Sequence, residues 1–487
     1  MNRQVRSVGY ALLILFGVAF LRLNWIQVVR AEQLANHPEN VRVLLREHAV
    51  ERGAILSADG DKTLAESKPT PDEELKYLRI YPTGPLFAHV VGYYSIVYGR
   101  DRLERTYTKA LTGRGGVLSM QDLGDRLLGK EEEGDTLVLS IDSRVQEAAT
   151  RALGSRKGAV VALDPINGEV LALVSSPSFD PNPLSGHDRT KMRERWEALQ
   201  ADPNKALLNR ATSQSYPPGS TFKVVTAAAA LEHDLGVDIS FPPVREYRPP
   251  QTDKSIRNFG GRSCGGDMAD AMQVSCNVYF ARLGVELPRG ALGETAREFG
   301  FGEVPPIDIR AAASRMPTED RLRSPAFVAQ SSIGQFDVSA TPLQMAMVAA
   351  GIAHDGKIMT PRIVKEVLDA RGALVRQTEA KLWREAITPR TAAVVKDLMV
   401  SVVESGTGTA ARISGIQVAG KTGTAQTQEG QAPHAWFISF APADSPRVAV
   451  AVVVEGGGDL GNEATGGRVA APIARQVLEA HRAVEGW

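Results

Sequence analysis

The sequence has few of the residues that build metal centres or nucleic-acid interfaces. Two cysteines and eight histidines occur in 487 residues, and no two histidines have the H-x-x-x-H spacing of a zinc-binding helix. Lys plus Arg and Asp plus Glu each number 56, so there is no basic surplus and no long charged tail. We therefore expect no metal, no other cofactor and no nucleic-acid partner.

The N-terminus indicates the compartment. Two arginines precede an apolar run that is uninterrupted from Val8 to Leu21 and continues, past Arg22, to Val29. A run of about twenty residues crosses the hydrocarbon core of a bilayer. Its length and the lack of an A-x-A site favour an uncleaved anchor over the alternative, a cleaved signal peptide. Positive residues remain inside, so the rest of the chain is expected outside the cytoplasmic membrane.

The two cysteines, Cys264 and Cys276, leave two interpretations open. They are either two free thiols or a disulfide that closes a short loop, and only an oxidising compartment permits the disulfide. An extracytoplasmic location makes the bond feasible, so we keep it as a hypothesis.

Strand and helix patterns divide the chain into four parts. We expect a cytoplasmic N-terminus at 1–8, a transmembrane anchor at 9–29, an N-terminal non-catalytic domain at 30–150 and a larger domain at 151–487. The larger domain opens with the hairpin pattern "GAVVALDPINGEVLALVSS" and closes with the strand patterns "HAWFISFAP" and "VAVAVVVEGG". Most of the chain between them has helical spacing, which predicts an α+β fold around an antiparallel sheet.

The stretch "GIQVAGKTGTA" matches two motifs. Gly415 to Thr422 spell G-x-x-x-x-G-K-T, the phosphate loop of nucleotide-binding proteins, and Lys421 to Gly423 spell K-T-G. A phosphate loop needs a helix after the lysine, but "GTAQTQEGQAPH" has no helical period. We therefore expect no nucleotide. Instead we expect a strand that starts at Gly415, with Gly420 allowing the close approach of a substrate backbone.

The stretch "SYPPGSTFKVVTAAAALEH" predicts a helix that begins directly after a Pro-Pro-Gly break. Ser220 would lie at its N-terminus, with Lys223 one turn later on the same face. Alone, the pair could also be a helix cap and a solvated lysine, although its position directly after the break favours a functional pair. As a functional pair, Ser220 is a nucleophile and Lys223 the base that activates it, provided that burial or a second cation lowers its pKa.

Two further elements follow in order. The chain contains one S-x-N, Ser275-Cys276-Asn277, and one K-T-G, Lys421-Thr422-Gly423. S-x-x-K, S-x-N and K-T-G together are typical of serine enzymes that form an acyl-enzyme. The chain here resembles the class B penicillin-binding proteins, most closely the penicillin-binding protein A branch of high-GC Gram-positive bacteria.

The resemblance implies the fold and the roles of the matching residues. It implies a penicillin-binding/β-lactamase-like transpeptidase domain, with a helical subdomain beside its sheet. Ser220 would be the nucleophile, Lys223 the base and Ser275 a proton relay, while Asn277 would hold a substrate amide. Lys421 would supply positive field, and Thr422, Gly423 and Thr424 would form the carboxylate-binding strand. The backbone N–H groups of Ser220 and Thr424 would form the oxyanion hole.

The resemblance also implies the partners. Peptidoglycan stem peptides would be substrates, β-lactams would acylate the enzyme, and a separate membrane glycosyltransferase of the SEDS type would be a partner. Three alternatives remain open at this point. The first two, a D,D-carboxypeptidase and a β-lactamase, share the fold, and the third is a membrane-anchored sensor or scaffold without activity.

Overall fold

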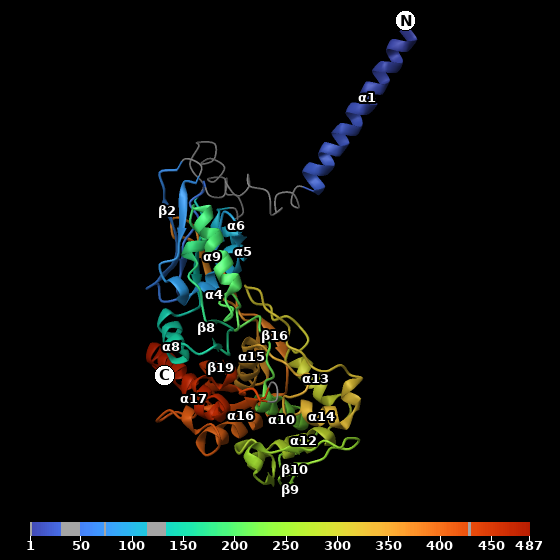
Figure 1. Ribbon diagram of the computed structural model, residues 1–487, viewed down its shortest axis with the longest axis vertical. Coiled ribbons are helices and arrows are strands. Elements are labelled where there is room, and N and C mark those ends of the chain that lie inside the picture. Colours follow the sequence, from blue (N-terminus) through green and yellow to red (C-terminus); the bar gives the residue numbers. More distant parts are fainter. Residues whose placement is uncertain (1, 31–48, 73–74, 114–132, 427–429) are drawn as a thin grey trace.

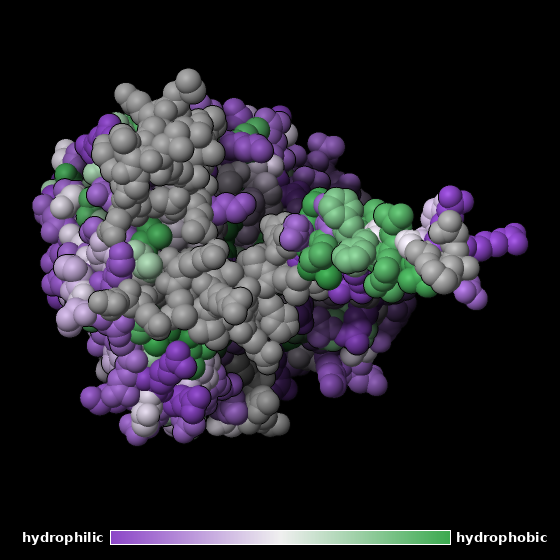
Figure 2. Space-filling view, turned by 90° about the horizontal axis from the view of Figure 1, so that it is seen from above, coloured by the Kyte–Doolittle hydropathy of each residue, from purple (hydrophilic) through white to green (hydrophobic). Residues whose placement is uncertain are grey.

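The computed structural model describes residues 2–30, 49–72, 75–113, 133–426 and 430–487. The N-terminal helix α1 (Asn2–Asn24) continues into one π-helical turn, η1 (Trp25–Val29). The stretch Arg6–Val29 is long and apolar enough to cross a membrane, and none of it is buried against the rest of the chain. Figure 1 shows this helix apart from the rest of the chain, and Figure 2 shows that its surface is largely apolar. The expected anchor, residues 9–29, falls within α1 and η1.

A five-stranded antiparallel sheet forms the centre of the larger part of the chain, in the order β17-β18-β19-β7-β8. Its strands are β7 (Gly158–Leu163), β8 (Val170–Ser176), β17 (Ala419–Ala425), β18 (His434–Ala441) and β19 (Val448–Val454). β7 and β8 form the expected hairpin, whose turn is closed by a 2.8 Å hydrogen bond from the Ile166 amide to the Asp164 carboxylate. β7 pairs with β19, so the strands at both ends of this part meet in one sheet.

Alternate side chains of the sheet enter two different cores. Val160 and Ala162 of β7 belong to one core, and Ala159 and Val161 to the other. The covering helices are α8 (Ser143–Leu153) and α17 (Gly466–Glu485) in the first core, and α15 (Pro342–Ala353) and most of α16 (Pro389–Glu404) in the second. This two-residue alternation is the reason that helices cover both faces.

A helical subdomain lies beside the sheet (Figure 1). Its helices are α10 (Lys223–Glu232), α11 (Met268–Gln273), α12 (Asn277–Glu286), α13 (Ala291–Glu298) and α14 (Pro325–Ser331). Two short ribbons precede α11: β9 (Phe241–Val244) pairs with β12 (Cys264–Gly266), and β10 (Glu246–Tyr247) pairs with β11 (Ile256–Arg257).

The N-terminal part is built around a six-stranded sheet of order β15-β14-β6-β1-β2-β3. The strands are β1 (Ile55–Leu56), β2 (Thr63–Pro69), β3 (Tyr77–Ile80), β6 (Thr136–Leu139), β14 (Val364–Leu368) and β15 (Leu374–Gln377). β1 pairs with β2 across a short turn, whereas β14 and β15 join this sheet from within the larger part of the chain. Because α8 packs against α17 and β8, the helix that spans residue 150 contacts the larger part, and the domain boundary stays a prediction.

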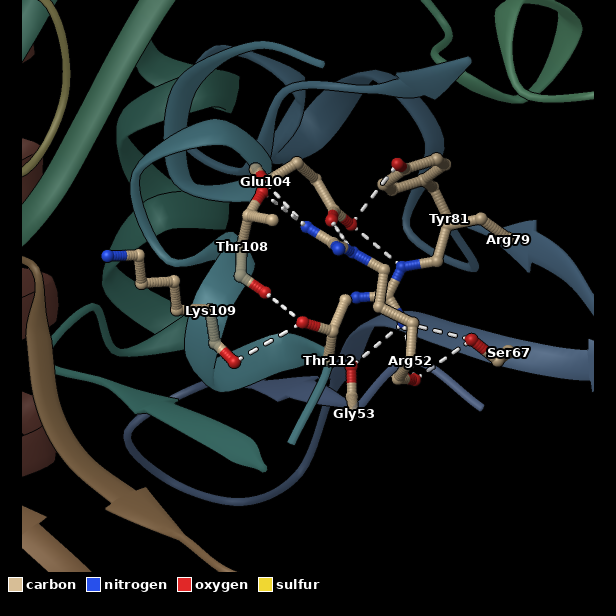
Figure 3. Close-up of polar contacts among 9 residues, drawn as sticks. All are labelled: Arg52, Gly53, Ser67, Arg79, Tyr81, Glu104, Thr108, Lys109 and Thr112. Carbon is tan, nitrogen blue, oxygen red and sulfur yellow. Dashed lines mark hydrogen bonds and ion pairs between the residues drawn. The ribbon is translucent and has the colours of Figure 1, made fainter. Parts of the chain in front are cut away.

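A buried cluster of charges holds this N-terminal part together (Figure 3). Glu104, in α5 (Arg102–Thr106), accepts hydrogen bonds from Arg52 Nε at 2.5 Å and Arg79 Nε at 2.7 Å. Arg79 also donates to the carbonyl groups of Arg52 and Gly53, at 3.0 and 2.8 Å. Burial opposes ionisation of the carboxyl, but the two guanidinium groups outweigh it and lower the pKa of Glu104. The cluster therefore ties α5 and β3 to the segment before β1.

The strand that carries K-T-G begins later than the sequence predicted. β17 starts at Ala419, because Gly415 adopts φ 78° in a tight turn between Ile413 and Ile416. β17 then continues to Ala425 without a helix after the lysine. This geometry excludes a phosphate-binding loop.

Candidate active site

Ser220 lies where an extended segment enters the apolar helix α10. It is not in the α-helix itself, as the sequence predicted, but in the 3-10 turn η4 (Gly219–Phe222) that precedes Lys223. Gly219 adopts φ 53°, and a Cβ on it would lie 2.9 Å from the carbonyl oxygen of Thr424. Its amide donates to the carbonyl of Gly334 at 3.0 Å. The Pro-Pro-Gly break thus seats the serine against β17 at a distance that only glycine allows.

The side chain of Lys223 is fully buried and ends at the S-x-N segment. Its Nζ donates to the Ser275 carbonyl at 2.8 Å, the Ser275 hydroxyl at 3.3 Å and Asn277 Oδ1 at 2.7 Å. Burial removes water from the ammonium and Lys421 repels it, so the pKa of Lys223 lies well below its usual value. A lysine whose charged form is disfavoured in this way can accept a proton from a serine hydroxyl.

Lys421 of β17 reaches the same hydroxyl. Its Nζ donates to Ser275 Oγ at 2.8 Å and to the carbonyl of Thr422 at 3.0 Å. This side chain is also fully buried, and burial lowers the pKa of Lys421 to about 7. One hydroxyl therefore joins two amines, which gives a route for a proton between them.

The S-x-N segment is held in an unusual conformation. Ser275 has φ 58°, in the left-handed region that serine seldom adopts. The next residue, Cys276, is bonded to Cys264 of β12, with 5.8 Å between their Cα atoms. Asn277 begins α12 and its Nδ2 donates to the Arg257 carbonyl at 3.0 Å. The disulfide and this hydrogen bond fix the segment against β12 and β11.

A single cleft of about 1420 Å³ brings the three elements together. Ser220 of η4, Ser275 and Asn277 of the S-x-N segment, and Thr422 and Thr424 of β17 all line it. The two buried lysines lie behind this wall. The residues that the sequence placed in one site are therefore neighbours in the structure.

β17 offers backbone donors to this cleft because it is the edge strand of its sheet. The carbonyl of Thr424 faces Gly219, since a Cβ there would lie 2.9 Å from its oxygen. In a strand, the N–H and C=O groups of one residue point to the same edge. The N–H of Thr424 therefore points toward the turn that carries Ser220.

The glycines of this strand serve packing. A Cβ on Gly423 would lie 2.9 Å from the Pro218 carbonyl oxygen and 2.9 Å from Trp436 Cβ. A Cβ on Gly420 would lie 2.6 Å from Phe437 Cζ. The expectation that Gly420 faces a substrate backbone is therefore wrong, because its α-carbon lies against the neighbouring strand.

Sequence reasoning missed Thr407, in the loop between α16 and β17. Its hydroxyl lies 2.6 Å from the Thr422 hydroxyl, and its amide donates to the Gln273 carbonyl at 3.1 Å. Thr407 also lines the cleft. Nothing in "SGTGTA" indicates these contacts, since they join segments far apart in the chain.

Comparisons with known proteins place the chain in a family. Residues 158–479 match the penicillin binding protein transpeptidase domain, and residues 52–137 match the penicillin binding protein A dimerisation domain. Peptidoglycan D,D-transpeptidase PbpA of Mycolicibacterium smegmatis is 40% identical over 493 residues, covering 99% of each chain. PbpA of Mycobacterium tuberculosis is 38% identical with the same coverage.

A solved structure agrees. The ceftriaxone acyl-enzyme complex of penicillin-binding protein A from M. tuberculosis superposes with a TM-score of 0.85 at 38% identity, over 90% of this chain and 99% of that one. Its fold is the transpeptidase fold that the sequence predicted. The chain belongs to the class B penicillin-binding proteins, which join a transpeptidase domain to an N-terminal dimerisation domain.

Proposed function

We propose that the chain is a peptidoglycan D,D-transpeptidase that cross-links stem peptides through an acyl-enzyme on Ser220. The observation that carries the proposal is the pair of buried lysines, Lys223 and Lys421, around the Ser275 hydroxyl. Lys223 would supply the base and the Ser275 hydroxyl the proton relay, beside a wide cleft. Relatives that carry this name match the whole chain, and one is seen acylated by a β-lactam.

In the first step, neutral Lys223 would take the proton of Ser220. Oγ would then attack the penultimate D-Ala carbonyl carbon, and the N–H groups of Ser220 and Thr424 would stabilise the oxyanion. One such donor is typically worth ~10²–10³ in rate. The C–N bond would then break, and the leaving D-Ala amine would receive its proton through Ser275. β-Lactams would acylate the same serine.

The terminal carboxylate of the donor peptide would lie along β17. Thr422 and Thr424 line the cleft there and would donate their hydroxyls, while Lys421 supplies positive field. Asn277 has its Oδ1 engaged by Lys223 at 2.7 Å, so its amide nitrogen is the group that would hold a substrate amide. In the second step an amine of a neighbouring stem peptide would take the acyl group.

The chain's place in the cell follows from its N-terminus. We propose that residues 1–8 stay in the cytoplasm, that 9–29 anchor the chain, and that the domains at 30–150 and 151–487 lie on the outer side. The match of residues 52–137 is to a dimerisation domain, so glycan polymerisation would require a separate enzyme, a membrane glycosyltransferase of the SEDS type. Protease added to intact spheroplasts should therefore digest both domains.

Labelling with a fluorescent penicillin tests the proposal. We expect a stable covalent adduct on the wild-type protein and none on Ser220→Ala. A folded wild-type protein without an adduct would contradict the proposal and favour a non-catalytic anchored protein. An adduct that is lost within seconds would indicate a β-lactamase. A stem-peptide thioester, supplied with and without a D-amino-acid acceptor, then separates transpeptidation from D,D-carboxypeptidation.

A further inference from the structure

The cleft wall on the S-x-N side carries a charge that the acylation chemistry does not use. Asp270 of α11 is the only carboxylate among the described residues that line the cleft. Its backbone takes part in hydrogen bonds, but within the described ranges no hydrogen bond or ion pair engages its carboxylate. Arg262 lines the same cleft and does not pair with it. The carboxylate is therefore available to a ligand.

The structure leaves a specific place for this carboxylate. Gly266 of β12 adopts φ 90°, and a Cβ on it would lie 2.3 Å from Asp270 Oδ2 and 3.0 Å from Asp270 Cβ. Any larger residue would displace the acid. The disulfide between Cys264 of β12 and Cys276 holds this strand next to Ser275. Asp270 thus lines the same cleft as Ser275 and Ser220.

Exposed apolar side chains line the cleft as well. Val274, four residues after Asp270, is 52% exposed, and Phe259 is 66% exposed. Both side chains line the same cleft as Asp270, so this cleft offers apolar surface as well as a carboxylate. A carboxylate together with apolar surface matches an aliphatic chain that ends in an ammonium group.

We propose that Asp270 binds the ammonium group of the acceptor stem peptide before acyl transfer; this rests on the proposed transpeptidase function. The acceptor arrives as R–NH₃⁺ and loses one proton to solvent. Its nitrogen attacks the ester carbon of the acyl-enzyme, the C–N bond forms and the bond from carbon to Ser220 Oγ breaks. A second amine proton returns to Oγ through Lys223. Asp270 is a binding residue that favours amines over water.

The test uses the stem-peptide thioester with two acceptors, glycinamide, which is largely cationic at neutral pH, and hydroxylamine, which is uncharged. For Asp270→Asn we expect the KM for glycinamide to rise roughly 3- to 5-fold, the value of an exposed ion pair. The salt dependence of this KM should also disappear. The KM for hydroxylamine, hydrolysis of the thioester and acylation by penicillin should not change.

Asp253→Asn is the matched control, because Asp253 is exposed on the loop between β10 and β11 and does not line the cleft. It should behave as wild type. An unchanged glycinamide KM in Asp270→Asn, or equal changes for both acceptors, would overturn the acceptor site while leaving the acyl-enzyme intact. A wild-type protein that forms no acyl-enzyme would overturn the proposed function itself, and the acceptor site with it.

Discussion

Lys223 and Lys421 donate to one hydroxyl, that of Ser275, at 3.3 and 2.8 Å. Both amines are buried, so each charge is disfavoured by lost hydration, and Lys421 lowers the pKa of Lys223 further. Proton removal at one amine is therefore coupled to the charge on the other. The pKa of Lys223, one turn from the nucleophile, is lowered both by burial and by the neighbouring charge, whereas that of Lys421 is lowered by burial alone. Lys223 therefore suits the role of base and Lys421 that of electrostatic partner.

The acylation rate should have a bell-shaped dependence on pH. It should rise as Lys223 loses its proton, because only the neutral amine can accept the proton of Ser220. It should fall as Lys421 becomes neutral near pH 7, because the positive field at the carboxylate site is lost. Stopped-flow acylation by a penicillin measures this profile. A rate that keeps rising well above neutral pH in the wild-type protein would contradict it.

The same burial makes stability depend on pH. An unfolded lysine keeps its proton to about pH 10.4, whereas Lys421 in the folded protein loses it near pH 7. Between these values the unfolded state binds more protons, so the free energy of unfolding rises with pH across this window. Lys421→Met should flatten this part of the rise, and calorimetric melting at several pH values measures it. If stability rises with pH equally steeply in both proteins, the pKa of Lys421 is not lowered in the folded state.

Loss of the disulfide should weaken both stability and acylation. For Cys264→Ser with Cys276→Ser we expect a loss of about 2–3 kcal/mol in the free energy of unfolding, as for a short closed loop. Acylation should slow as well, because Cys276 lies between Ser275 and Asn277. Denaturant unfolding and penicillin labelling measure the two effects. Reduction of the wild-type protein is the control, and acylation at the wild-type rate after reduction would show that the bond does not position the S-x-N segment.

Gly219→Ala should slow acylation by about 100-fold, the effect of misplacing a reacting group by roughly 1 Å. A Cβ at this position would lie 2.9 Å from the Thr424 carbonyl oxygen, in a backbone region with φ 53°. Gly186→Ala is the matched control, since a Cβ there has no neighbour within 4 Å. The measurement is the acylation rate constant of each variant, and only that of Gly219→Ala should fall below the wild-type value. Equal rates would mean that the turn can shift without moving Ser220.

The sequence predicted those parts of the fold that local patterns determine. Runs of β-branched residues identified β7 and β8, and the turn Asp164–Gly168 between them identified their hairpin. The strand patterns near the C-terminus identified β18 and β19. The residues that meet in the site were predicted from the family resemblance, which S-x-x-K, S-x-N and K-T-G in this order indicate.

Other features depend on contacts that no local pattern records. The left-handed Ser275 needs the surrounding hydrogen bonds and the disulfide to hold it. Thr407 is recognised as part of the site only from the contact of its hydroxyl with that of Thr422. The expected role of Gly420 was wrong because its neighbour Phe437 comes from another strand. β14 was missed for the same reason, since its partner β6 lies more than 200 residues earlier in the chain. β15 was missed with it, because β15 pairs only with β14 among the described strands of this sheet.

The pairing of β14 with β6 has a consequence for the order of assembly. Until residues Val364–Leu368 have been synthesised, β6 has a partner only in β1 and exposes its other edge. The N-terminal sheet therefore cannot be completed before residues 364–377 have been synthesised, which requires more than half of the transpeptidase part. The two parts mature together, so a truncation before residue 364 would leave an open strand edge prone to aggregation rather than a finished N-terminal domain.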